Sequence, residues 1–242
     1  MEKGGVHVAN NVPVYIQIHD QIKTEIEKGK WKIGDRLPSE RELSVQFNVS
    51  RMTLRQAIQT LADEGILERK IGSGTYVARK KVQEKMSGTT SFTEIMLSQN
   101  RKPSSKTISY FVAKPSSSEM EKLHLGEEDS IVRMERIRYA DDVPICFEVA
   151  SLPLDIVGEY SKQEISRSLY QTLESKGGLK IGHANQTISA MVASERIAEY
   201  LDVKKGAAIL RLRQVSYLED SRPFEYVRTQ YVGNRFEFYL EK

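Results

Sequence analysis

Residues 38–77 read PSERELSVQFNVSRMTLRQAIQTLADEGILERKIGSGTYV, and this stretch decides the fold of the first third of the chain. Ser39, with Glu42 three residues later, has the pattern of a capping box and predicts the start of a short helix. Ser50 is placed to cap a longer helix over 51–64, whose apolar residues recur along one face. We therefore expect two helices separated by a tight turn.

The residues on either side complete the arrangement. Upstream, apolar residues recur every four positions between 12 and 29, which predicts an amphipathic helix. Downstream, β-prone runs at 66–70 and 75–78 flank IGSG at 71–74, whose glycines tolerate the positive φ of a tight hairpin. Helix, helix, turn, helix and hairpin is the order of a winged helix-turn-helix domain, which we place over residues 1–78.

The third helix of this domain carries the side chains expected to read bases. Arginine in the first turns of a recognition helix can bind guanine O6 and N7 with two hydrogen bonds. Arg51 and Arg55 are one turn apart and share a face. On an arbitrary helix such a pair is usually solvated surface, but a capped third helix followed by a glycine hairpin favours base contact. Gly72 and Gly74 suit a wing tip lying in the minor groove, and Lys70 would lie beside a phosphate. The expected DNA-binding residues are Ser39, Arg41, Ser50, Arg51, Thr53, Arg55, Lys70, Gly72, Ser73 and Gly74.

The charge distribution agrees with this placement. Residues 1–81 carry 14 Lys/Arg against 10 Asp/Glu, whereas the other residues carry 22 against 23. The basic excess is therefore concentrated in the part expected to meet phosphates, although a surplus of this size is also common on solvated surfaces.

The rest of the chain predicts a second domain. The polar segment RKKVQEKMSG at 79–88 is the expected linker, and residues 89–242 are the expected domain. Strands predominate there and are often joined by hairpins, so we expect an α+β domain built around an antiparallel sheet. The stretches expected to be helical are Phe92–Gln99, Ser117–Leu125, Ser166–Ser175 and Ser194–Leu201. The fold class is thus a mixed α and β chain of two domains.

The first domain resembles a known family. The runs LPSEREL, SRMTLRQAI and GSGTYV occur in order and at the spacing of the N-terminal signature of GntR-type regulators, and the likeness covers about residues 12–78. The resemblance implies that Arg41, Arg51 and Arg55 contact operator bases. It also implies that Gly72 enters the minor groove.

The second domain resembles the UTRA effector domain of the HutC branch, whose fold is similar to chorismate lyase. The motifs that carry this likeness are TTSFTE at 89–94, RMERIRYADDVPICFEVASLP at 133–153 and FEYVRTQYVGNRFEF at 224–238. The resemblance argues against the all-helical effector domains of other GntR branches.

Physically, these motifs suit an anionic, hydroxyl-rich ligand. Hydroxyl groups gather before and within an expected helix N-terminus at 90–93, where free N–H groups favour a phosphate. Arg136 and Arg138 alternate on a strand and so share a face, and Glu148 on the next strand can face the same site. Arg–Glu pairs on neighbouring strands are more often surface pairs. The expected effector-binding residues are Thr90, Ser91, Phe92, Thr93, Arg136, Arg138, Glu148, Ser168, Tyr170, Glu225 and Tyr231.

The resemblance extends to regulators that respond to amino-sugar phosphates. It implies that phosphate is bound by Thr93, Arg136, Ser168 and Tyr170. It implies that the sugar portion is bound or lined by Arg138, Glu148, Glu225 and Tyr231. The expected effector is glucosamine-6-phosphate or N-acetylglucosamine-6-phosphate, which would control N-acetylglucosamine utilisation genes. Trehalose-6-phosphate and other phosphosugars would use much the same phosphate site.

Several classes of protein and site are not expected. The lone Cys146 excludes an intrachain disulfide and a multi-cysteine zinc site, and the four histidines have no metal-ligand spacing, so we expect no metal and no cofactor. No apolar run approaches a membrane span, and residues 1–11 lack the apolar core of a secretory signal. The expected location is the bacterial cytoplasm, in association with the nucleoid.

The function expected from these features is a ligand-controlled repressor. A chorismate-lyase-like enzyme is the alternative from another class, but a nucleophile–base pair and a Gly-rich cofactor loop are missing from the sequence. A constitutive DNA-binding protein whose second domain only dimerises is a third reading. Because one winged helix offers few base contacts, we expect a homodimer on a palindromic double-stranded operator. We further hypothesise that effector orders residues 89–94 and thereby repositions the linker at 79–88.

Overall fold

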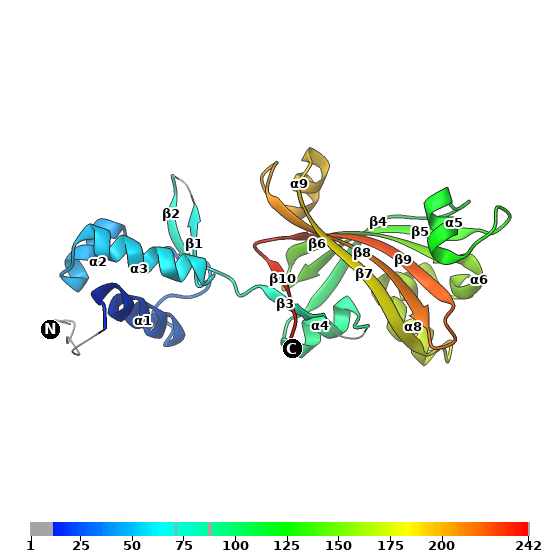
Figure 1. Ribbon diagram of the computed structural model, residues 1–242, viewed down its shortest axis with the longest axis horizontal. Coiled ribbons are helices and arrows are strands. Elements are labelled where there is room, and N and C mark those ends of the chain that lie inside the picture. The colour runs from blue at the N-terminus through cyan, green and yellow to red at the C-terminus, as the bar shows by residue number, and fades with distance from the viewer. Residues whose placement is uncertain (1–11, 71, 87–88, 242) are drawn as a thin grey trace. The chain divides into compact units, whose positions relative to one another are not determined.

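The computed structural model describes residues 12–70, 72–86 and 89–241, and it divides into two compact units between Lys80 and Lys81 (Figure 1). Each unit has its own hydrophobic core. The predictions made for residues 1–11, for Ile71 in the hairpin and for positions 87–88 of the linker lie outside the described residues.

The first unit has the predicted winged helix-turn-helix order. It consists of α1 (Val14–Glu27), α2 (Glu40–Phe47), α3 (Arg51–Asp63), β1 (Leu67–Lys70) and β2 (Gly74–Val77). The two strands pair antiparallel as the wing. Apolar residues of all three helices are fully buried in one core, among them Ile18, Ile22, Leu43, Leu54 and Leu61.

A few residues whose roles the sequence predicts fix where α2 and α3 begin and allow the tight turn of the wing. The capping box is confirmed, because the Ser39 hydroxyl accepts a hydrogen bond from the backbone N–H of Glu42 while the Glu42 carboxylate accepts one from the Ser39 N–H. Ser50 caps α3 in the same way through the backbone N–H of Thr53. Gly72 and Gly74 have φ of +74° and +129°, values that L side chains rarely adopt. The tight wing therefore depends on glycine at these two positions.

The second unit is built on one six-stranded antiparallel sheet, which confirms the predicted α+β class. Its strand order is β4-β5-β6-β9-β8-β7. The strands are β4 (Pro103–Ala113), β5 (Ile131–Ala140), β6 (Val143–Pro153), β7 (Ile181–Val192), β8 (Ala208–Leu218) and β9 (Pro223–Val232). The central strands are the most buried, so polar side chains on them either find partners or line a cavity.

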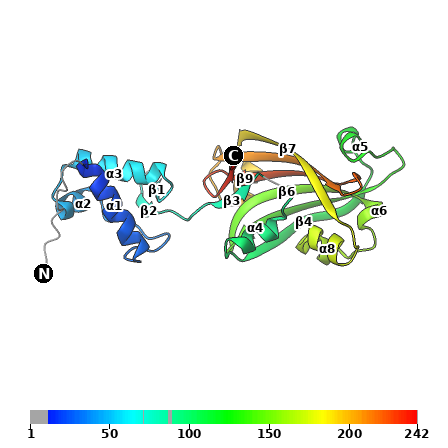
Figure 2. The same ribbon diagram turned by 60° about the horizontal axis from the view of Figure 1, so that its bottom comes forward.

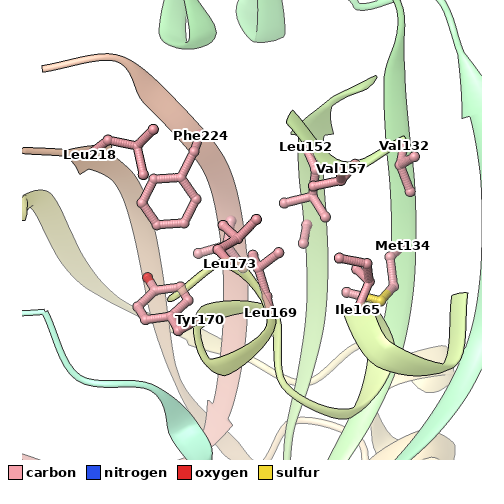
Figure 3. Packing of buried hydrophobic residues seen from close by; sticks show 12 residues of the cluster. Val132, Met134, Leu152, Val157, Ile165, Leu169, Tyr170, Leu173, Leu218 and Phe224 are labelled. Atoms are coloured by element: carbon pink, nitrogen blue, oxygen red, sulfur yellow. The ribbon is translucent and has the colours of Figure 1, made fainter. Parts of the chain in front are cut away.

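Short helices flank this sheet. They are α4 (Phe92–Ser98), α5 (Ser117–Leu123), α6 (Leu154–Val157), α7 (Lys162–Arg167), α8 (Leu169–Ser175) and α9 (Glu195–Leu201). Figures 1 and 2 show α5, α6 and α8 toward one end of the sheet. Figure 3 shows how α8 is attached: Leu169 and Leu173 pack into the apolar cluster, and the Tyr170 ring lies edge-on to Phe224 with centroids 5.4 Å apart.

The single helix predicted over 166–175 is instead two helices that meet at Ser168, where φ is −159°. The cause is a tertiary contact. The carbonyl oxygens of Ile165 and Ser166 accept hydrogen bonds from the guanidinium of Arg136, at 3.4 and 2.9 Å. These two carbonyl groups belong to the last turn of α7. Ser168, which follows in an extended conformation, then begins α8 in a new direction.

The expected linker at 79–88 is shorter in the structure. Val82–Lys85 form strand β3, which pairs in parallel with β10 (Phe236–Tyr239) of the second unit. Val82 and Glu84 are buried while Gln83 and Lys85 are exposed. The polar composition of the segment conceals this alternation, because one of its two inward-facing residues is a glutamate.

None of the helices in the described ranges combines the length and the apolar character needed to cross a membrane.

Candidate DNA-binding surface and effector site

The residues predicted to bind DNA gather on α2, α3 and the wing of the first unit. Arg41 and Arg51 are exposed, and so are the wing-tip residues Gly72, Ser73 and Gly74. Ser39 and Ser50 already serve as helix caps through their hydroxyl groups. Their position at helix starts remains compatible with a phosphate contact, although the Ser39 N–H already donates to Glu42.

Arg55 differs from the other two arginines because it is held within the domain. Its guanidinium donates to Glu40 Oε2 from Nε and Nη2, at 3.2 and 3.0 Å. The other oxygen of Glu40 accepts a hydrogen bond of 2.7 Å from Arg69 on β1. Glu40 thus ties the second and third helices to the wing, and the sequence alone does not indicate this link because the three residues are far apart in the chain.

The wing has one contact that the sequence analysis missed. The ammonium of Lys70 lies over the Tyr76 ring, 4.7 Å from its centroid, and the Tyr76 hydroxyl is 2.6 Å from the Ser73 hydroxyl. Tyr76 therefore contacts two of the predicted wing residues, Lys70 and Ser73. Alternation along the strand, which places Tyr76 on one face of the wing, is the sequence feature that could have identified this residue.

The effector residues predicted from the sequence line one cavity of the second unit. The cavity has a volume of about 60 Å³, and all eleven predicted residues are among its lining. It lies between α4, the start of α8 and the central strands of the sheet. The lining residues that the sequence analysis did not predict are Glu84, Ile95, Leu169, Leu212, Gln214, Val227 and Thr229. Most of these come from strands whose side-chain direction is set only by the register of the folded sheet.

Arg136 and Glu148 form a buried ion pair in the wall of the cavity. They are direct partners across β5 and β6, and the guanidinium Nη2 lies 2.5 Å from Glu148 Oε1. A second hydrogen bond of 2.7 Å joins Arg136 Nε to the same oxygen, while Nη1 donates to the carbonyls that end α7. All three nitrogens of Arg136 therefore have partners within the protein.

Arg138 is buried in the same wall but has few partners. It is 2% exposed, and Nη2 donates to the Thr93 hydroxyl at 3.3 Å. Its Nε and Nη1 have no hydrogen-bond partner among the described residues. The Phe92 ring lies 4.5 Å from the guanidinium carbon. Burial and the neighbouring charge of Arg136 lower the pKa of Arg138 to about 10, so the side chain is still a cation at neutral pH.

Glu225 is the centre of a buried hydrogen-bond network on the opposite side of the ion pair. Tyr170 and Ser216 donate from their hydroxyl groups to Glu225 Oε2, at 2.9 and 3.1 Å. Gln214 donates to both hydroxyl oxygens. Burial, together with the charge of Glu148, raises the pKa of Glu225 to about 7. This part of the cavity wall therefore offers a ligand hydroxyl, amide and carboxyl groups that carry little net charge.

Tyr231, which lines the cavity, and the neighbouring Cys146 act mainly by packing. Tyr231 stacks on Phe236, with ring centroids 3.9 Å apart, and belongs to the apolar cluster beside the cavity. Cys146 is fully buried in the same cluster. Over the described residues, no group of three or more His, Cys, Asp and Glu side chains has the geometry of a metal site.

Comparison with known proteins places these two sites in a family. Residues 14–77 match the bacterial regulatory proteins of the gntR family, and residues 98–237 match the UTRA domain. The chain is a member of the gntR family of bacterial regulatory proteins. This gntR-family regulator therefore binds DNA through its winged helix-turn-helix and carries an effector-binding UTRA domain. It belongs to a class of transcription regulators, not of enzymes.

Two relatives cover nearly the whole regulator, and one solved structure covers over half of it. The HTH-type transcriptional repressor NagR of Bacillus subtilis strain 168 is 35% identical over 94% of this chain and 93% of its own. The mannosyl-D-glycerate transport/metabolism system repressor MngR of Escherichia coli strain K12 is 31% identical over 94% of this chain and 95% of its own. A solved structure of a GntR-family transcriptional regulator from Enterococcus faecalis V583 is 73% identical, covers 57% of this chain and 100% of its own, and has a TM-score of 0.55.

Proposed function

We propose that this regulator is a repressor that binds a palindromic operator as a homodimer and is released by a phosphorylated amino sugar. The observation that carries the choice of ligand is Arg138, a buried cation whose Nε and Nη1 have no partner among the described residues and whose guanidinium lines the cavity. A buried charge without a partner is costly, so such a group favours an anion that completes its hydrogen bonds.

The charge balance of the cavity supports an anionic ligand. Arg136 and Glu148 neutralise each other at 2.5 Å. Glu225 has its pKa raised to about 7, so it contributes only part of a negative charge at neutral pH. Glu84 also lines the cavity and has its pKa raised to about 7. Arg138 makes no ion pair with either acid among the described residues, and its guanidinium fork suits a phosphate.

The other groups of the cavity suit the sugar portion. Glu148, Glu225 and Tyr170 offer oxygen atoms that accept hydrogen bonds from hydroxyl or amine groups. This division differs from the one that the resemblance implies, in which Arg136 rather than Arg138 binds phosphate. We assign the phosphate to Arg138 and Thr93, because every nitrogen of Arg136 has a protein partner while two nitrogens of Arg138 have none among the described residues.

The relatives support repression but leave the sugar open. NagR and MngR are both repressors by name, and MngR belongs to a mannosyl-D-glycerate system. Glucosamine-6-phosphate and N-acetylglucosamine-6-phosphate are our first candidates, and trehalose-6-phosphate is the second. Release from DNA requires a difference in effector affinity between two arrangements of the protein, typically 1–3 kcal/mol or about 5- to 150-fold. Thr93 on α4 touches Arg138, so an effector bound there would act on the segment at 89–94.

The first test is calorimetric titration of the full chain with these three phosphosugars and with the unphosphorylated sugars. We expect saturable binding confined to one phosphosugar. That compound should then weaken binding to a DNA duplex selected by the protein from a random pool. Arg51→Ala should lose the duplex and keep the sugar. Binding of an unphosphorylated sugar with equal affinity would contradict the assignment of Arg138.

A further inference from the structure

Glu84 on β3 is a buried acid that the proposed effector site has not used. It lines the cavity and is 7% exposed. Its Oε2 is fully buried and has no hydrogen-bond partner among the described residues. A buried carboxyl oxygen without a partner costs free energy, so its presence on a cavity wall calls for a physical reason.

Among the described residues that line the cavity, no cation compensates Glu84. Arg136 is paired with Glu148, and Arg138 contacts Thr93 and Phe92. Burial raises the pKa of Glu84 to about 7. The carboxyl is therefore a weakly charged hydrogen-bonding group in the wall of the cavity.

The place of Glu84 in the chain adds to this argument. β3 begins at Val82, directly after the boundary between the two compact units at Lys80 and Lys81. Val82 is fully buried among the apolar residues beside the cavity, so the strand holds Glu84 in a defined direction. The pairing of Glu84 with Phe238 of β10 fixes its register.

We infer that Glu84 is a further effector-recognition residue, whose carboxyl accepts a hydrogen bond from a hydroxyl or amine group of the sugar portion. This inference rests on the proposed function. It makes the first strand of the effector domain part of the effector site, so that the ligand contacts the strand that leads directly to the DNA-binding unit.

The test compares Glu84→Leu with Gln83→Leu in the full chain. Gln83 is the matched control, because it is the neighbouring polar residue of β3 and is exposed on the other face. Titration with glucosamine-6-phosphate should show affinity about 10- to 100-fold weaker for Glu84→Leu, the value of a lost hydrogen bond to an ionisable group, and unchanged for Gln83→Leu. The melting temperature of ligand-free Glu84→Leu should equal or exceed that of the natural chain, since an unpartnered polar group has been replaced by an apolar one. Glu84→Gln, which keeps an acceptor oxygen, should recover part of the affinity.

The outcomes separate the inference from the proposed function. If the natural chain binds the phosphosugar and Glu84→Leu binds it within twofold, Glu84 is not a ligand contact while the phosphosugar function stands. A fall in both melting temperature and affinity for Glu84→Leu, with no recovery in Glu84→Gln, would show a structural role and overturn the inference. If the natural chain binds none of glucosamine-6-phosphate, N-acetylglucosamine-6-phosphate and trehalose-6-phosphate, the proposed effector and this inference fall together.

Discussion

Arg55 of α3 donates two hydrogen bonds to a single carboxylate oxygen of Glu40 in α2, at 3.0 and 3.2 Å. An arginine that we propose to read operator bases is thus already held by a carboxylate in the protein without DNA. Both side chains are partly exposed, so the pair is weak and can exchange for a guanine. We therefore expect Glu40 to oppose operator binding, both by holding Arg55 and by adding a negative charge to the surface proposed to meet the phosphates.

Glu40→Gln should therefore increase affinity for the operator. A surface ion pair is worth up to about 1 kcal/mol, so we expect a gain of about two- to fivefold at low salt. Fluorescence anisotropy with a labelled duplex measures it. Glu27→Gln, which removes the same charge from the exposed C-terminal turn of α1, is the control for a general charge effect. Equal gains in the two variants would argue against a specific role for the Glu40–Arg55 pair.

Arg138→Met should weaken effector binding without lowering the stability of the protein. Removing a buried guanidinium with unpartnered nitrogens is expected to leave the free energy of unfolding unchanged or to raise it. Loss of two charge-assisted hydrogen bonds to phosphate should weaken the phosphosugar by about 100-fold or more. Thermal unfolding and calorimetric titration give the two quantities. Arg228→Met, on the exposed side of β9, should change neither, and a matching loss of affinity there would contradict the assignment.

Glu225 should make the effector domain less stable as the pH rises. Its pKa is raised to about 7 by burial and by Glu148, above the ordinary 4.5, so the folded state holds a proton that the unfolded state has lost. The contribution is fully present below about pH 4.5 and is lost as the pH rises to about 7, an effect of a few kcal/mol. Chemical denaturation from pH 5 to 8 measures it. The neighbouring acid Glu84 titrates in the same range, and its contribution has the same sign.

The matched variant is Glu225→Gln, which keeps an acceptor for Tyr170 and does not titrate. It should flatten the fall in stability between pH 5 and 8, and combination with Glu84→Leu should flatten it further. An unchanged slope in the double variant would show that neither carboxyl titrates in this range.

Glu119 should behave in the opposite way. Burial alone would raise its pKa, but hydrogen bonds from Arg133, Ser151 and Ser116 outweigh burial and hold the pKa at about 2. The stabilisation is therefore present above about pH 4.5 and is lost as the pH falls toward 2.

Glu119→Gln should accordingly lower the free energy of unfolding at pH 7 on the order of 3 kcal/mol, because it leaves the Arg133 charge without its partner on α5. Urea denaturation followed by circular dichroism measures the loss. The difference between variant and natural chain should shrink at pH 3, and Glu121→Gln on the exposed side of the same helix should change little. A difference that stays constant with pH would contradict an electrostatic origin.

The local features of the fold were predictable from the sequence because short-range rules govern them. The capping box of Ser39 and Glu42, the α3 cap at Ser50 and the positive φ of Gly72 and Gly74 each depend on residues a few positions apart. The hairpin-linked strands of the sheet were likewise indicated by local alternation.

The predictions that failed involve contacts between distant residues. The helix expected over 166–175 is divided because Arg136, 30 residues earlier, takes the Ser166 carbonyl. The expected linker contains a strand because β10, at the other end of the chain, supplies a partner for 82–85. Neither partner can be identified from the composition of the segment itself.

The sequence by itself indicated that Arg136 and Arg138 line the same candidate site, because residues two apart on a strand share a face. Only the tertiary structure decided what each of them is free to do. Arg136 and Arg138 are equivalent in pattern, yet the register of β5 with β6 places Glu148 opposite Arg136 and leaves Arg138 with buried nitrogens that have no partner among the described residues. The free energy of a buried charge depends on its partners in space, and pairing across a sheet brings those partners together from positions that the local pattern does not relate.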